Sequence, residues 1–198
     1  MFVARIAAVV SNGCNPDPRV LREARWLCEG GHEVTIHAFD RLENLLQEED
    51  IRGVKILRHR VGKTPYGGTF STALGLRRFR TSVRKSLEKS SVRIDLLHCH
   101  DADTLPLAHS TEAKILFDMH DLHHTWALMP NPKSPIRKIA SKQMERAMIR
   151  RAMKADAVIT SSEGFANWLS SNKISATVIE NRPQRQTKLP LPATPTIG

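Results

Sequence analysis

Residues 5–39 read RIAAVVSNGCNPDPRVLREARWLCEGGHEVTIHAF, and this stretch decides the fold. Its first apolar run predicts a buried strand over Ala4–Ser11. Asp17 and Pro18 then predict the start of a helix, because aspartate caps a first turn and proline is tolerated at the first helical position. A Gly-Gly pair ends that helix, and EVTIHAF reads as the next strand. A strand, a helix and a second strand in this order predict a parallel pair joined by a helical crossover.

The same alternation continues along the chain. Short, nearly continuous apolar runs are typical of strands that are covered on both faces, and longer amphipathic stretches lie between them. We therefore predict an α/β fold of Rossmann-like type, with an open, mostly parallel sheet of about seven strands and helices on both faces. The predicted strands are Ala4–Ser11, Glu33–Phe39, Val54–His59, Asp95–His100, Lys114–Met119, Ala157–Ser162 and Ala176–Asn181.

The length of 198 residues allows one well-buried core and falls short of two full-sized domains. Prolines recur in residues 183–198, which disfavours a regular element there. We predict a Rossmann-like domain over 1–182, followed by a proline-rich linker over 183–198. No apolar run approaches the length of a membrane span, and the first residues do not have the pattern of a signal peptide.

The three cysteines, Cys14, Cys28 and Cys99, are odd in number and match neither a disulfide framework nor the CxxC spacing of a metal site. We expect Cys28, on a predicted helix, and Cys99, in a predicted strand, to pack in the core. A reducing, cytoplasmic setting follows from this use of cysteine.

The formal net charge of +10 favours anionic partners, which include anionic lipid, phosphate-bearing ligands and nucleic acid. Two predicted helical stretches, 76–89 and 135–154, are strongly basic. In the second stretch the residues expected to face the core are Ile139, Met144, Ala147, Ile149 and Met153. A nucleic-acid-binding module is an alternative that rests on charge alone, because the chain has no helix-turn-helix, RRM or zinc-finger pattern.

Polar residues follow three of the predicted strands. In doubly wound sheets ligands bind at the carboxyl ends of the strands, near the point where the strand order reverses. Asn12-Gly13 follows the first strand, where a glycine loop before a helix lets backbone N–H groups approach an anion, although the same loop also reads as a tight turn. His100-Asp101 and His120-Asp121 end two further strands. Histidine can donate a proton or bind a hydroxyl, so we expect a shared site at this edge.

Other polar residues at this edge have simpler interpretations. His98 is expected to be a buried, hydrogen-bonded histidine, and His123 and His124 are expected at a loop or helix start. Asp118 lies in an apolar strand and needs a partner if it is buried. His120 is the residue for which we expect a function.

A metal site is the alternative at the same place. Side chains at i and i+2 of a strand project from one face and can share an ion, which makes a metal-dependent hydrolase conceivable on His98, His100 and Asp101. Their spacing matches neither the HxHxDH pattern of zinc hydrolases nor HExxH.

Five segments carry a family resemblance when they are taken together. They are DPRVLREARWLCEGGHEVTIHA (17–38), LLHCHDADTLPLA (96–108), KILFDMHDLHHTW (114–126), ADAVITSSEGFANWL (155–169) and VIENRP (178–183). In this order they resemble the N-terminal domain of the family 4 retaining glycosyltransferases of GT-B fold, and they span nearly the whole chain.

The resemblance implies an enzyme with a cleft between two Rossmann-like halves, of which this half binds the acceptor. It implies a catalytic role for His120 and donor-phosphate contacts at Asn12 and Gly13, with no metal required. Asp121 stands where a glutamate is commoner in the family, and Asn12-Gly13 stands where many relatives have Gly-Gly. The residues that we assign to the acceptor or the sugar are Asp17, Arg19, His100, Asp101 and Asp121.

The resemblance also implies partners. The paired carboxylates of the family's C-terminal domain have no counterpart here, so residues 183–198 look like the start of an absent donor-binding domain. We expect the chain to bind no cofactor tightly by itself and to be inactive alone, while the full enzyme uses a nucleotide-sugar donor and a sugar or lipid-linked acceptor. The basic stretches then suggest a peripheral position on the inner face of an anionic membrane.

Overall fold

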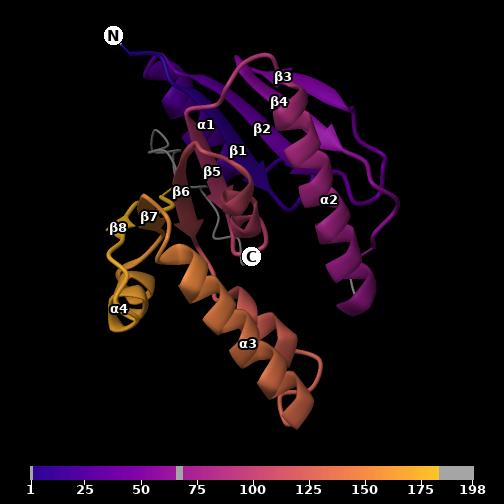
Figure 1. The fold of residues 1–198 in the computed structure, drawn as a ribbon, viewed down its shortest axis with the longest axis vertical. Helices are drawn as coiled ribbons and strands as arrows, with labels where there is room; N and C mark the ends of the chain where they lie inside the picture. Colours follow the sequence, from indigo (N-terminus) through magenta and orange to yellow (C-terminus); the bar gives the residue numbers. More distant parts are fainter. Residues whose placement is uncertain (1, 66–68, 183–198) are drawn as a thin grey trace, which may run out of the picture.

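The computed structural model describes residues 2–65 and 69–182, and it has the predicted open α/β sheet (Figure 1). The predicted linker at 183–198 lies outside the described residues. The sheet has eight strands in the order β3-β4-β2-β1-β5-β6-β7-β8, and all pairs are parallel except β3 with β4. The strands are β1 Arg5–Val10, β2 Glu33–Phe39, β3 Glu48–Ile51, β4 Val54–His59, β5 Leu96–His100, β6 Lys114–Met119, β7 Ala157–Thr160 and β8 Thr177–Val178.

The connections between the strands are mostly helical, as the sequence predicts. The first helix begins with Asp17 as its cap, since the Asp17 carboxylate accepts a hydrogen bond from the Val20 amide at 3.2 Å. It ends at Glu29, and Gly31 just beyond it has a φ of 86°, which favours glycine. The helices are α1 Pro18–Glu29, α2 Thr69–Lys89, α3 Pro135–Ala152 and α4 Glu163–Ser171, with short 3-10 segments η1 Leu105–Ser110 and η2 His123–Leu128.

Strand β3 is the one that the sequence did not reveal. It has four residues, EEDI, of which three are acidic, so it carries no apolar run. It pairs with β4 through a tight turn in which Arg52 and Gly53 both have positive φ, 55° and 84°, as in the two-residue hairpins that match strand twist. Short, charged strands are common at sheet edges because they discourage pairing with another chain.

The sheet is covered on both faces, and each face has its own apolar core. Helix α1 packs Val20 and Ala24 against one face, on side chains of β1, β2 and β4. The other face is covered by α2, α3 and α4, which bring Phe79, Met148 and Leu169 into one cluster (Figure 1). Cys99 is buried in this second core and Cys28 packs at the edge of the first, and all three cysteines are free.

The predicted core side of α3 is only partly correct, because Ile149 packs against the core whereas three of the other four residues are exposed. Ile139, Met144 and Met153 are 60%, 40% and 58% exposed, whereas Met148 and Ala152 are buried. The reason is that α3 packs on η1 and η2, and much of it extends past the end of the sheet (Figure 1). Its apolar residues near Pro135 therefore have no core to cover.

A search of the described residues finds no helix with both the length and the apolar character needed to span a bilayer. The basic helices α2 and α3 lie on the same face of the sheet, where they join one apolar core.

Two buried histidines form a pair under α2. His37 Nδ1 lies 3.0 Å from His59 Nε2, and His59 Nδ1 lies 2.8 Å from the Ser82 hydroxyl. Burial and the neighbouring His59 lower the pKa of His37 from 6.5 to about 3. Burial lowers the pKa of His59 from 6.5 to about 4. Both rings are therefore neutral in the folded protein across the physiological range.

This pair predicts a loss of stability in mild acid. Above about pH 6.5 the rings are neutral in both states, and the stability is complete. As the pH falls toward about 4, the two histidines bind protons in the unfolded chain but not in the folded chain. The free energy of unfolding therefore drops by up to about 1.4 kcal/mol per pH unit for each ring. Urea titrations between pH 7 and 4.5 measure this slope. His59→Gln is expected to reduce it, and an equal slope in both proteins would contradict the assignment.

Candidate functional site

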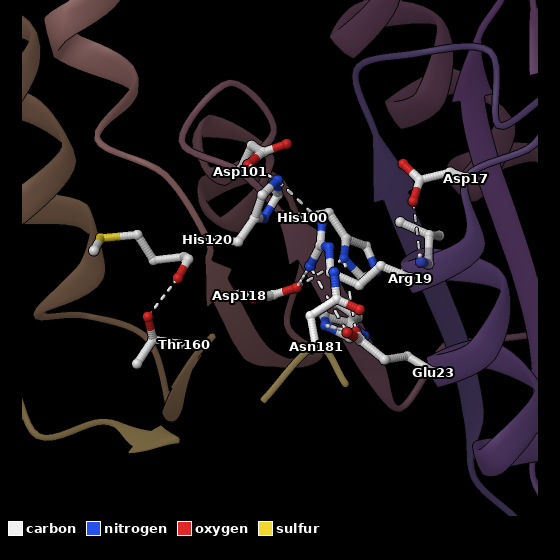
Figure 2. Close-up of polar contacts among 12 residues, drawn as sticks. Asp17, Arg19, Glu23, His100, Asp101, Asp118, His120, Thr160 and Asn181 are labelled. Carbon is white, nitrogen blue, oxygen red and sulfur yellow. Dashed lines mark hydrogen bonds and ion pairs between the residues drawn. The ribbon is translucent and has the colours of Figure 1, made fainter. Parts of the chain in front are cut away.

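The site lies where the strand order reverses. Strand β1 has β2 on one side and β5 on the other, so the chain turns in opposite directions after β1 and β5 and leaves a crevice beyond their carboxyl ends. The loop after β1, the first turns of α1 and the ends of β5 and β6 meet there (Figure 2). These four segments supply almost all of the site residues that the sequence predicted.

Arg19 is the centre of a buried ion network that joins α1 to β6. Its Nη1 donates to Asp118 Oδ2, and it also lies 3.7 Å from a Glu23 oxygen (Figure 2). His100 Nδ1 lies 3.1 Å from the same oxygen of Asp118. Burial raises the pKa of Asp118, but His100 and Arg19 outweigh it, and the pKa falls to about 2. Asp118 thus finds the partners that its buried position requires.

Glu23 belongs to this network although the sequence interpretation did not select it. Its Oε2 lies 3.9 Å from both His98 Nε2 and His100 Nδ1, and neither Glu23 Oε2 nor His98 Nε2 has a hydrogen-bond partner among the described residues. Burial and Asp118 raise the pKa of Glu23, while burial and His100 lower that of His98. The sequence did contain a signal for Glu23, because it lies three residues after the buried Val20, on the side of α1 that faces the sheet.

The residues that could share a metal ion differ from the set predicted from the sequence. Glu23, His98, His100 and Asp118 offer ligand atoms within 4.8 Å of one another, whereas Asp101 lies in a second group with His120 and Asp121. In the first group the Arg19 guanidinium already contacts both carboxylates. Because a cationic side chain already contacts both carboxylates and offsets part of their charge, we describe the cluster as a buried ion network.

His120 follows β6 and sits between a carboxylate and the guanidinium. Its Nε2 lies 2.8 Å from Asp101 Oδ1 and 3.2 Å from Arg19 Nη2 (Figure 2). Burial lowers the pKa of His120, but the hydrogen bond and the charge of Asp101 outweigh it, so the pKa lies above 6.5. The other nitrogen, Nδ1, has no hydrogen-bond partner among the described residues. The ring as a whole is 24% exposed, but Nδ1 itself is buried, so a ligand reaches this unpaired nitrogen only if the side chains that cover it move.

Replacing Asp101 with asparagine is expected to lower the pKa of His120. The variant loses the hydrogen bond and negative charge of Asp101, which raise this pKa, while burial and Arg19, which lower it, and Asp118, which raises it, remain. Titration of the His120 Cε1–Hε1 signal by NMR measures the change. Asp50→Asn, on the edge strand β3, is the matched control and should leave the titration as in the unmodified protein. An unchanged His120 titration in the Asp101 variant would contradict the pairing.

A second group of carboxylates lies beside His120. Asp121 is close to Asp101 and His120, and Asp103 Oδ2 lies 3.2 Å from His123 Nε2 and 3.4 Å from the Ser11 hydroxyl. Burial and the charge of Asp101 raise the pKa of Asp121, and burial raises that of Asp103. Asp101 itself has a positive φ of 69°, which turns the chain sharply at the end of β5.

An arginine of strand β4 fixes the conformation of the loop after β1. Arg58 of β4 is 2% exposed and donates to three carbonyl oxygens, from Nε to Gly13 at 2.7 Å, from Nη1 to Leu46 at 2.9 Å and from Nη2 to Cys14 at 3.3 Å. A Cβ on Gly13 would meet Leu45 Cδ1 at 2.6 Å, so the end of the Leu45 side chain would have to move to make room for it. The loop is therefore preformed.

Asn12 and Asp17 bond to one another within this loop. Asn12 Nδ2 donates to Asp17 Oδ2 at 2.9 Å, and Asn12 Oδ1 accepts from the Cys14 amide at 2.8 Å. Because Asp17 also caps α1, both of its oxygens already have protein partners. The structure thus brings together Arg19, His100, Asp101, His120 and Asp121, whereas it gives Asn12, Gly13 and Asp17 a role in shaping the loop beside them.

Comparison with protein-family models gives one match of direct relevance. The model described as glycosyl transferase 4-like domain matches residues 16–182. A comparison with curated protein sequences finds no match.

Solved structures show the same fold. Sucrose-phosphate synthase from Thermosynechococcus elongatus superimposes with a TM-score of 0.70 at 14% identity, over 89% of this chain and 48% of that chain. The catalytic domain of starch synthase IV from Arabidopsis thaliana, bound to ADP and acarbose, gives 0.60 at 12% identity, over 89% and 52%. Arabidopsis thaliana UGT89C1 complexed with quercetin gives 0.62 at 12% identity, over 96% and 53%. The chain thus spans about half the length of these three proteins.

Proposed function

The chain belongs to the family of glycosyl transferase 4-like domains, and on that premise we propose that it forms the acceptor-binding half of a retaining glycosyltransferase. The full enzyme would transfer a sugar from a nucleotide-sugar donor to a hydroxyl of a sugar or lipid-linked acceptor. The GT-B fold, which this chain shares with enzymes about twice its length, supports a cleft with the crevice at the ends of β1, β5 and β6 as one wall.

The observation that carries the proposal is the setting of His120. Asp101 contacts Nε2 and raises the pKa of His120 above its ordinary value, which favours the form of the ring that also carries a proton on Nδ1. In this role Nδ1–H donates to an oxygen of the transferred sugar and fixes its position while the bond to the diphosphate breaks. Positioned donors of this kind contribute more in a water-poor site than in bulk water.

Arg19 and the loop after β1 complete the proposed wall. Arg19 keeps Asp118 in register, and its charge lies at the crevice where donor phosphates would enter. The backbone of Asn12 and Gly13 lies at the same edge, with its conformation fixed by Arg58. Asp101, Asp103 and Asp121 would accept hydrogen bonds from acceptor hydroxyls.

A donor-binding domain is the partner that the proposal requires. The solved two-domain enzymes bind nucleotides, as ADP in starch synthase IV and UDP in UGT89C1. We propose that this chain needs such a domain for tight donor binding, and that neither domain requires a metal. The alternatives, a metal-dependent hydrolase and a nucleic-acid-binding module, have no comparable support.

The test is donor turnover with and without that domain. A panel of UDP-, GDP- and ADP-sugars is incubated with the chain alone and with the chain joined to a donor-binding Rossmann domain, and release of the nucleoside diphosphate is measured. We expect turnover only in the joined form. Turnover by the chain alone would contradict its role as one half of the site, and no turnover with any donor in the joined form would contradict the transferase proposal.

A further inference from the structure

The free end of α3 is an apolar tip on a projecting helix. The end of α3 near Pro135 lies farthest from the sheet, and the helix extends beyond the rest of the molecule there (Figure 1). Ile136 is 77% exposed and Ile139 is 60% exposed, and Met129, on the segment that leads into the helix, is 74% exposed. Large apolar side chains with this exposure, gathered at a protruding end, indicate a surface that meets a partner.

The same side of α3 becomes basic away from the tip. Ile136, Ile139, Gln143, Arg146 and Arg150 follow one another at intervals of three or four residues, so they form one stripe along the helix. The buried Met148 and Ala152 lie on the opposite side. At a rise of about 1.5 Å per residue, Arg146 lies about 10 Å and Arg150 about 16 Å along the axis from Ile139. The apolar end and the basic section are thus separated by distances of the order of a lipid headgroup layer.

Among the residues that the structure describes, the basic section has no acidic partner on its own side. Glu145 is the acid of this helix, and it lies 3.7 Å from His124 on the side that packs against η2. A shallow hollow of about 370 Å³ opens between Gln143, Arg146, Ile149 and Arg150. Guanidinium groups around a partly apolar floor fit a phosphate on an acyl chain.

We infer that α3 docks on an anionic membrane surface, with Ile136 and Ile139 entering the acyl boundary and Arg146 and Arg150 at the headgroups. The charge of the stripe is complementary to anionic lipid, and its apolar tip matches the depth of about 5–10 Å that interfacial helices reach. A nucleic acid would bind the basic section but would gain nothing from contact with the isoleucine tip. The inference stands apart from the proposed transfer reaction, because vesicle binding requires neither donor nor acceptor.

The test is co-sedimentation of the chain with vesicles of phosphatidylcholine alone and of phosphatidylcholine with phosphatidylglycerol. We expect binding to the anionic vesicles that weakens in 1 M salt, where the screening length is about 3 Å. Arg146→Gln with Arg150→Gln is expected to lower the partition coefficient about 30-fold. Ile136→Ser with Ile139→Ser is expected to lower it at least about 10-fold, because the tip no longer gains from burial.

Arg77→Gln with Lys85→Gln on α2 is the matched control. It removes the same charge from exposed positions of the other basic helix, and it is expected to change the partition coefficient by less than about 3-fold. All substituted residues are exposed, so thermal unfolding should show intact folds. Four outcomes would overturn the inference: no binding to anionic vesicles, equal losses in the α2 and α3 charge variants, no loss in the isoleucine variant, or a dimer of this chain that the isoleucine variant abolishes.

Discussion

Replacing Arg19 with methionine is expected to lower the free energy of unfolding of this domain by about 3 kcal/mol or more. Arg19 is 11% exposed and Asp118 is 4% exposed, so the substitution leaves an almost fully buried carboxylate without its cation. Glu23 loses a neighbouring positive charge in the same step. A domain of this size is stable by about 5–15 kcal/mol, so the loss is a large share of the whole.

The control is the same substitution at Arg5. Arg5 lies 3.1 Å from Glu33, but the two side chains are 50% and 66% exposed, and such a surface pair contributes about 1 kcal/mol or less. Urea denaturation of both variants, followed by circular dichroism at pH 7.5, compares the two losses. Similar losses at Arg19 and Arg5 would show that the buried network does not hold α1 to β6.

Replacing His120 with alanine is expected to reduce kcat of the joined two-domain enzyme by about 10²–10⁴-fold, with little change in the KM of the donor. The reason is that the proposed hydrogen bond from Nδ1 matters most as the bond to the diphosphate breaks. Initial rates of nucleoside diphosphate release over a range of donor concentrations separate kcat from KM. Thermal unfolding of the variant separates this effect from a loss of stability, because the substitution removes the ring that contacts a buried Asp101 oxygen.

His109→Ala is the control for the kinetic experiment. His109 is exposed in η1 and belongs to none of the segments that form the crevice. We expect its kcat to stay within about 2-fold of the unmodified enzyme. If the His120 variant keeps the same kcat as the His109 variant, His120 has no part in the reaction.

Much of this site follows from the order of the strands. His100-Asp101 and His120-Asp121 come directly after two strands that a parallel sheet places side by side, so their meeting at one edge is predictable from the sequence. Asp101 and His120 do form a close pair. The apolar runs of the strands and the two ends of α1 are also predictable from the sequence. Aspartate, proline and glycine act on helix ends locally, within a few residues.

Contacts over long distances in the chain are less accessible to such reasoning. Arg58 reaches the loop after β1 from a strand 44 or 45 residues away, and nothing near Arg58 marks it as different from an ordinary strand residue. Glu23 carried a signal in its position on the core side of a helix, but its partners on β5 and β6 depend on how α1 sits across the sheet. Side-chain partners of this kind follow from tertiary packing rather than from local pattern.

The errors in the predicted core side of α3 also come from tertiary packing. Several apolar residues are spread around this helix, so periodicity alone does not decide which of them face the core. The placement of η1 and η2 under the helix buries Met148 and Ala152, and leaves Ile136 and Ile139 at the tip. The exposure of these apolar residues is visible only in the structure, and the proposed docking of α3 rests on it.

The most direct test of the central claim is the stereochemistry of the product made by the joined two-domain enzyme. The donor that supports turnover is supplied with an acceptor, and the anomeric proton coupling of the new glycoside is measured by ¹H NMR before the product can equilibrate. We expect a product with the same anomeric configuration as the donor, formed by the enzyme with His120 and nearly absent with His120→Ala. An inverted product, or a retained product formed equally well without His120, would contradict it.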